Sequence, residues 1–257
     1  PLHILLGDKE YGDGKNITPD QIYTWSDANK TTPKTSAPAL ADAMELFRPY
    51  AEAGREIVCF SISAGMSTSG NVMRLAAEEL GASDRIKVID SANLSTGIGL
   101  LVVEAAIMAK NNRTASQIVS EIERLKPNVR ASFVVDTLTY LYRGGRCNAV
   151  AAMAGGVLKL HPRIVVEDGA MNASKKYRGK IASVVMNYVK DMEKDLKKAR
   201  PERVFITHSG CEQETVEKVR AYLKELDIFD EILETRAGGV VSSHCGPGTL
   251  GVLYIAK

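Results

Sequence analysis

The chain has 257 residues, of which 45% are hydrophobic and 25% charged, as in an ordinary soluble globular protein with a sizeable core. Its 33 basic and 31 acidic residues leave a net charge of +2, and 6% of its residues are aromatic, which argues against a nucleic-acid-binding or membrane-surface protein. No apolar run approaches the ~20 residues that a transmembrane helix needs.

The first part of the chain predicts a strand, two loops and two helices. In chain order these are an apolar strand at 1–7, a polar loop at 8–18, a helix that begins near Thr18, a hydroxyl-rich loop at 31–39 (TTPKTSAPA) and a helix at 40–53. Thr18, Pro19 and Gln21 are typical of a helix start, because they supply an N-cap, a proline at the first helical position and the second half of a capping box.

Residues 56–70 carry the strongest functional signal. An apolar run stops at a serine-rich turn, and the spacing of an amphipathic helix begins behind it at 71–80. This unit puts a ligand at the carboxyl end of a strand, where the next helix offers unpaired N–H groups to an anion. The turn supplies five hydroxyls and no charge, which suits a single carboxylate: Ser61, Ser63, Ser67, Thr68 and Ser69. The alternative is that these hydroxyls only cap the helix.

The next elements alternate in type. They are a strand at 85–91, an apolar helix at 93–110 that contains Ser95, Gly97 and Gly99, an amphipathic helix at 114–126 capped by Thr114, and a strand at 131–135. Strands that alternate with helices predict a mostly parallel sheet with helices on both faces.

The pattern changes after residue 136. We expect a helical turn at 138–142, small apolar residues at 149–157, a hairpin of 158–167 and 170–174 joined at Asp168-Gly169, helices at 180–199 and 212–226, and strands at 203–207, 231–235 and 251–256. The sequence therefore predicts an α/β protein with two domains. The first, at 1–145, is a mostly parallel α/β domain, and the second, at 146–257, is an α+β domain with a hairpin and a cleft toward the first.

Three side chains of the second half could meet the serine turn. Arg146 follows a double glycine, Arg178 precedes Gly179, and His244 stands in a loop that ends in Gly-Pro-Gly. Arginine matches a carboxylate or phosphate with its planar fork, and histidine switches charge near neutral pH. The alternative is that the arginines are solvated and the histidine structural. His161 is a weaker candidate.

The four cysteines stand apart, with no CxxC pair and no Cys/His cluster at metal-ligand spacing. We therefore expect a cytoplasmic protein without a structural metal. The sequence also lacks the glycine-rich phosphate loops of nucleotide-dependent enzymes, so we expect that it is not itself a kinase.

Several motifs in the right order resemble the DegV family of bacterial fatty-acid-binding proteins, the lipid-carrying subunit of fatty acid kinase. They are TTPKTSAPA at 31–39, ISAGMSTSGN at 62–71, VIDS at 88–91, LTYLYRGGR at 138–146, the Asp-Gly hairpin and SHCGPGTLG at 243–251. The resemblance implies that one long-chain fatty acid is buried in a tunnel between the domains. A separate kinase subunit would then phosphorylate its carboxylate for phospholipid synthesis. It implies no cofactor besides the bound fatty acid, and it allows transient membrane contact.

The resemblance also implies roles for individual residues. Thr35, Ser36, Ser63 and Ser95 would bind the carboxylate, and Arg146, Arg178 and His244 would contact the head group or the phosphoryl group. The chain departs from the usual family pattern at four places: Ala37, Ala64, Thr68-Ser69 and His161. The family also normally opens with a strand carrying an Asp-Ser pair and a helix ahead of the segment that matches Pro1, so we expect the first sheet to lack a strand.

A serine esterase is the competing hypothesis. The segment from Ser61 to Gly65 is one residue from the G-x-S-x-G nucleophile elbow, and the chain order would allow Ser63 as nucleophile, Asp90 or Asp136 as the acid and His244 as the base.

Overall fold

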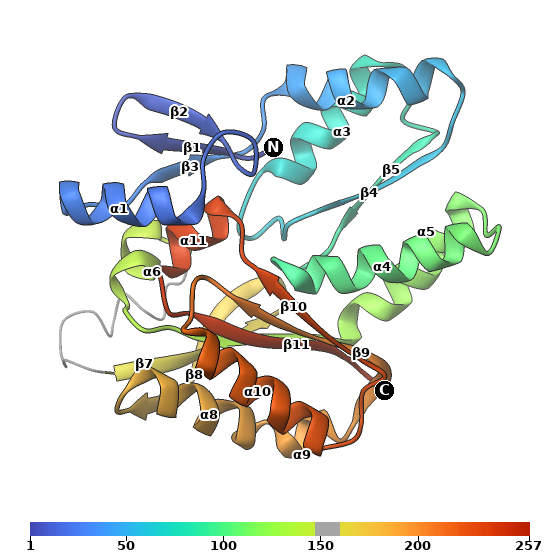
Figure 1. The fold of residues 1–257 in the computed structure, drawn as a ribbon. Coiled ribbons are helices and arrows are strands. Elements are labelled where there is room, and N and C mark those ends of the chain that lie inside the picture. Colours follow the sequence, from blue (N-terminus) through green and yellow to red (C-terminus); the bar gives the residue numbers. More distant parts are fainter. Residues whose placement is uncertain (147–159) are drawn as a thin grey trace.

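A six-stranded sheet crosses the lower half of the molecule in the computed structural model, which describes residues 1–146 and 160–257 (Figure 1). Its strands follow the order β10-β9-β11-β6-β7-β8, in which β9 and β10 are parallel and the other neighbours antiparallel. The strands are β6 (Val129–Val134), β7 (Leu160–Glu167), β8 (Ala170–Arg178), β9 (Ala199–His208), β10 (Glu231–Arg236) and β11 (Leu250–Ala256). The fold is therefore mixed α/β.

Helices cover both faces of this sheet (Figure 1). On one face, apolar side chains of α8 (Ile181–Asp191), α9 (Glu193–Leu196) and α10 (Gln213–Glu225) pack against the strands. On the other, α4 (Thr96–Lys110) and α5 (Ala115–Leu125) form a second apolar core with the strands; the short 3-10 helix η1 (Lys126–Asn128) follows α5. The buried face of α5 (Ala115, Ile118, Ile122 and Leu125) repeats the amphipathic spacing seen in the sequence.

Two small sheets complete the fold. Strands β4 (Ile57–Ser61) and β5 (Ile86–Asp90) are parallel, and helices α2 (Leu40–Glu52) and α3 (Ser69–Glu79) pack beside them. The other sheet is antiparallel, with the order β2-β1-β3 from β1 (His3–Leu6), β2 (Lys9–Gly12) and β3 (Lys34–Ser36). Helix α1 (Pro19–Asn29) lies next to this sheet at the upper left of Figure 1.

The structure corrects several sequence predictions. The strand expected in the first domain at 131–135 is β6, which pairs with β7 and β11 in the six-stranded sheet, so the first half contributes a parallel sheet of only β4 and β5. The expected loops at 8–18 and 31–39 contain β2 and β3. The helix expected at 180–199 divides into α8 and α9, and β9 already begins at Ala199. The boundary at 145/146 stays a prediction, and the segment 149–157 lies outside the described residues.

Local hydrogen bonds confirm the helix starts predicted at Thr18 and Thr114, and backbone angles confirm the predicted hairpin turn. The Thr18 and Gln21 side chains form the expected capping box at the start of α1, and Thr114 caps α5 in the same way. At the β7–β8 turn, Asp168 and Gly169 have φ angles of 50° and 75°. Positive φ at both central residues is the conformation that an Asp-Gly turn favours.

A helix that the sequence analysis missed, α11 (Gly239–Cys245), begins at a cap from the far end of the chain. The Asp13 carboxylate accepts hydrogen bonds from the N–H groups of Gly239, at 2.6 Å, and Val240, at 2.9 Å. The cap satisfies two of the unpaired N–H groups at the helix start and places a negative charge at the positive end of its dipole. Asp13 therefore joins the first sheet to α11.

Replacing Asp13 with alanine is expected to lower the free energy of unfolding by about 2 kcal/mol, because the two N–H groups lose a charged acceptor. Asp13→Asn keeps one acceptor oxygen and should lose less. Urea denaturation of the two variants and the wild type measures the effect. An alanine variant within about 0.5 kcal/mol of the wild type would contradict the proposed cap.

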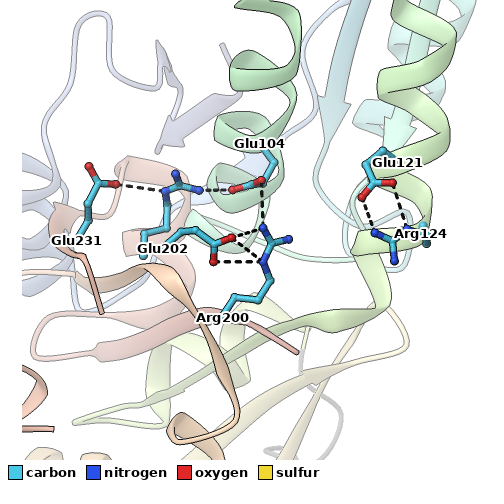
Figure 2. Close-up of polar contacts among 7 residues, drawn as sticks. Glu104, Glu121, Arg124, Arg200, Glu202 and Glu231 are labelled. Carbon is cyan, nitrogen blue, oxygen red and sulfur yellow. Dashed lines mark hydrogen bonds and ion pairs between the residues drawn. The ribbon is translucent and has the colours of Figure 1, made fainter. Parts of the chain in front are cut away.

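Ion pairs join α4 to β9, the strand next to the edge strand β10 of the six-stranded sheet (Figure 2). Glu104 on α4 pairs with Arg203 and lies 3.7 Å from Arg200, both on β9. Arg203 also reaches Glu231 on β10 at 3.4 Å, and Arg200 bonds Glu202. Glu104 and Arg203 are only 15% and 10% exposed, so their pairing occurs largely out of water.

Candidate functional site

The structure brings Thr35 and His244 together although they are 209 residues apart. Thr35 lies on β3, and its Oγ1 is 2.8 Å from Nε2 of His244. His244 lies in the last turn of α11, immediately before the Gly246-Pro-Gly turn, rather than in the loop that the sequence predicted. The hydroxyl-rich segment and the SHCGPG segment therefore meet at one point.

The His244 imidazole is held neutral. Burial, and next the positive charge of Arg146, lower the pKa of His244 to about 4. Its Nδ1 atom is buried without a hydrogen-bond partner among the described residues and faces Gly144, where an added Cβ would lie only 2.3 Å away. Residue 144 therefore needs to be a glycine for the imidazole to occupy this position.

A cavity of about 70 Å³ lies beside this pair. Its polar wall includes Thr35, Ser36, Ser67, Arg146 and His244. Its apolar wall consists of Leu2, Ala37, Ile62, Met66, Leu94, Met171, Val240, Val241 and Cys245. The cavity thus has hydroxyls and a neutral imidazole on one side and aliphatic and thioether groups on the other.

Ser63 is near this cavity but is bonded elsewhere. Its hydroxyl donates to the carbonyl of Gly169 in the β7–β8 turn at 2.6 Å and accepts from the N–H of Gly65 at 3.1 Å. The side chain is 2% exposed. In this conformation Ser63 fastens the hairpin turn to the serine-rich turn, and a ligand could take its proton only by displacing Gly169.

The remaining predicted residues differ in position. Arg146 lines the cavity, is exposed, and donates to the carbonyl of Gly144 at 2.7 Å. Ser95 precedes α4 with a φ of 50°, makes no side-chain cap and does not line the cavity. Arg178 is exposed at the end of β8 opposite Leu160, eight residues and about 27 Å along the strand from the hairpin turn, and it is outside the lining.

The serine-esterase hypothesis requires a hydrogen bond between Ser63 and His244, and no such bond forms in the described structure. Ser63 is bonded to Gly169, and Nε2 of His244 to Thr35. The acids that the hypothesis invoked are also engaged elsewhere. Asp90 accepts from the backbone of Ala64 and Ala92, and Asp136 lies 3.7 Å from His161. The geometry therefore does not support a catalytic triad.

Residues 1–146 and 160–257 contain neither a metal-binding group of side chains nor a membrane-spanning helix. No group of three His, Cys, Asp or Glu side chains is arranged to hold a metal ion there. In the same part of the chain, no helix is long and apolar enough to cross a membrane.

A family model described as DegV family matches residues 1–257. The chain belongs to the DegV family. A DegV domain-containing protein of Deinococcus radiodurans is 31% identical over 253 residues, which cover 98% of this chain and 88% of that protein.

Two solved structures show the same fold. A DegV family protein from Thermus thermophilus, described by its fatty acid binding, is 27% identical with a TM-score of 0.89, over 100% of this chain and 91% of that chain. A stearic acid-binding protein from Eubacterium ventriosum is 28% identical with a TM-score of 0.86, over 100% and 90%. Structural relatives of this DegV chain therefore bind fatty acids.

Sequence reasoning missed most of the apolar lining of this DegV cavity. Met66 comes from the turn between β4 and α3, Met171 from β8, and Val240 and Val241 from the unpredicted helix α11. The apolar pair directly before Ser242-Ser243-His244 was a usable signal, because a valine pair beside candidate polar residues is typical of an amphipathic ligand site. Nothing in the sequence around Met66 or Met171 indicated that either methionine lines a cavity.

Proposed function

We propose that this chain binds one long-chain fatty acid in the cavity beside Thr35 and His244, with the carboxylate at the hydroxyl groups and the acyl tail among the apolar side chains. The 2.8 Å contact between Thr35 and the neutral His244, at the polar end of an otherwise apolar lining, is the observation that carries this proposal. The fatty-acid binding of the relatives from Thermus thermophilus and Eubacterium ventriosum supports it.

The carboxylate would be bound mainly by neutral groups. Thr35 and Ser36 are the first candidates because they line the cavity; Ser63 would join after releasing Gly169, and Ser95 would need a larger movement. Hydrogen bonds to a charged acceptor contribute about 1.5–3 kcal/mol each, which offsets part of the cost of burying the carboxylate. A tail of some fourteen methylenes adds on the order of 11 kcal/mol at ~0.8 kcal/mol per methylene, before ordering costs.

The acyl chain would have to widen the cavity. A volume of about 70 Å³ is well below the roughly 300–1,000 Å³ of ordinary ligand cavities. The lining contains Met66 and Met171, whose unbranched side chains change rotamer at low cost. We therefore expect the tail to enter as these side chains move apart.

Uptake of palmitate by delipidated protein tests the binding site. We expect native mass spectrometry to show one palmitate per chain, and Thr35→Val to weaken binding by roughly 10-fold to 100-fold because one hydrogen bond to the carboxylate is lost. Thr24→Val is the matched control, because Thr24 is exposed on α1, its hydroxyl donates to the carbonyl of Asp20, and it is not among the residues that line the cavity. Failure of the wild type to take up palmitate would refute the proposal. Equal affinity of the two variants would refute the assignment of Thr35.

The chain would act as a carrier that presents the carboxylate to a separate kinase. The exposed Arg146 at the cavity supports this role, because a guanidinium there can stabilise charge on an acyl phosphate while the kinase supplies the nucleotide. With hydroxylamine as a trap, palmitoyl hydroxamate should form from the loaded protein and ATP only when the kinase subunit is present. Hydroxamate formed without any kinase would show that the chain is itself an enzyme.

A further inference from the structure

A second and larger cavity, of about 830 Å³, lies between α9, the start of β6 and the end of β7. Its volume is within the roughly 300–1,000 Å³ typical of ligand sites. Its wall contains Ala92, Asn93 and Gly169, whereas the fatty-acid cavity is lined by Ile62, Leu94 and Met171. The two cavities thus share no lining residue.

Cationic side chains outnumber acidic ones in this lining. The cations are Lys126, Arg130, Arg163, Lys198 and Lys257, and the acids are Glu167, Asp168 and Asp195. Lys126 is paired with Glu123 at 2.5 Å, but none of the other four cations has a carboxylate within 4 Å in the described part of the chain. Because unpaired cations around a concave surface focus a positive potential there, the cavity favours an anion.

Arg163 is held in place inside this cavity without a polar partner. Its guanidinium carbon lies 5.7 Å from the centre of the Tyr188 ring, a cation–π geometry. Tyr188 is fully buried and fixed by its hydroxyl, which donates to the carbonyl of Ser132 at 2.7 Å and accepts from the N–H of Val252 at 3.0 Å. The Nε of Arg163 is buried with no hydrogen-bond partner among the described residues. Because Nε is buried, the donors left for a ligand are the terminal nitrogens of this guanidinium, which form no hydrogen bond or ion pair within the described residues.

Two further groups complete the polar wall. Arg130 is anchored by one nitrogen, Nη1, which donates to the carbonyls of Pro127 at 2.7 Å and Val129 at 3.3 Å, so its other nitrogens are free to donate. Tyr254 is 3% exposed, and burial together with the charge of Asp195 raises its pKa to about 12, so its hydroxyl is a neutral donor. Val165, Met192 and Ala256 supply an apolar surface beside these groups.

We propose that this cavity is an anion site for a phosphate-bearing organic molecule, with Arg130 and Arg163 on the phosphate and the apolar surface on the organic part. Arginine forks match phosphate oxygens bidentately, and phosphate carries more charge than one carboxylate to offset two guanidinium groups. The cavity is large enough for an organic group as well as the phosphate. The phosphate can belong to a free metabolite or to the head group of a lipid.

Calorimetric titration with pyrophosphate, and sedimentation with phosphatidylglycerol vesicles, test the site and distinguish the two sources. For a free phosphate ligand we expect pyrophosphate to bind at 150 mM salt; for a lipid head group we expect co-sedimentation with phosphatidylglycerol but not with phosphatidylcholine vesicles. In either case two variants should each weaken binding at least 10-fold. They are Arg130→Gln and Arg163→Met, and the second keeps an unbranched side chain over Tyr188. Arg124→Gln is the control, because it removes the same charge from an exposed site on α5.

If Arg163→Met does not fold, two further variants test the same anion site. Tyr254→Phe removes only a hydroxyl, and Lys198→Gln changes only the rim of the cavity; both should weaken binding about 3-fold or more while circular dichroism stays unchanged. Absence of binding to both pyrophosphate and phosphatidylglycerol vesicles would overturn the proposal. The proposal would also be overturned if Arg124→Gln weakened binding as much as Arg130→Gln, because binding would then depend on the net charge alone.

Discussion

Replacing Glu104 with glutamine is expected to lower the free energy of unfolding by about 3 kcal/mol, because breaking a buried ion pair leaves the remaining charge without compensation. Arg203 is only 10% exposed, and within the described residues the one carboxylate left within 4 Å of it would be Glu231, which is 55% exposed. Glutamine preserves the size of the side chain, so the loss reports the charge and not a cavity. Urea denaturation measures it.

The control for this variant is Glu121→Gln, whose ion pair is shown beside it in Figure 2. Glu121 bonds Arg124 on the same helix, and Arg124 is 72% exposed. Because solvent screens such a pair, its loss should cost far less than that of Glu104, and this cost should shrink at 1 M salt, whereas the loss for Glu104 should persist. Equal effects of the two variants would show that the Glu104 network is no better shielded than a surface pair.

The parts of the fold that the sequence predicted are those specified by near neighbours. The capping boxes of Thr18 with Gln21 and Thr114 with Gln117 lie within four residues of chain, and the Asp168-Gly169 turn needs only two. Their hydrogen bonds and backbone angles depend little on the rest of the protein. Element starts were therefore predictable where a local motif was present.

Pairing between distant segments was not predictable in this way. Nothing in residues 129–134 shows that β6 pairs with β11 rather than with the parallel strands before it, because strand choice depends on contacts made only in the folded chain. The α11 segment begins Gly-Val-Val-Ser-Ser, a poor helix-forming sequence, and its cap Asp13 is more than 220 residues away. The pattern of apolar and polar residues in one sequence shows neither the pairing of β6 with β11 nor the cap that Asp13 gives to α11.

The same distinction between local motifs and contacts of distant segments applies to the candidate site. Thr35, Ser36, Arg146 and His244 were named from the sequence because polar groups in motif context are conspicuous, and the structure places all four in one lining. Ser63 was named for the same reason, but its bond to Gly169 joins two turns whose proximity the sequence does not reveal. The sequence thus predicted polar side chains that gather around one cavity, but not which of the hydroxyls is already bonded within the protein.

The protonation of His244 leads to the second large expected effect, a loss of stability in acid. The folded-state pKa of about 4 lies below the usual 6.5, so between these values the unfolded chain binds a proton at this position and the folded chain does not. The neutral His244 therefore makes its full contribution to the free energy of unfolding above pH 6.5, and this contribution is lost as the pH falls toward 4. At ~1.4 kcal/mol per pH unit, the loss at pH 4.5 relative to pH 7 should be about 2–3 kcal/mol.

Removing the imidazole should remove this part of the acid sensitivity. His244→Gln keeps a polar group within reach of Thr35 but does not titrate, so its free energy of unfolding should fall by about 2–3 kcal/mol less than that of the wild type between pH 7 and pH 4.5. Thr35→Val is the matched control in delipidated protein. It removes the hydrogen bond at Nε2 but leaves the imidazole buried beside Arg146, so it should lower stability at both pH values and retain the wild-type slope. If instead His244→Gln retained that slope, the histidine would already be protonated or solvated in the folded protein, and the neutral imidazole proposed to meet the carboxylate would be excluded.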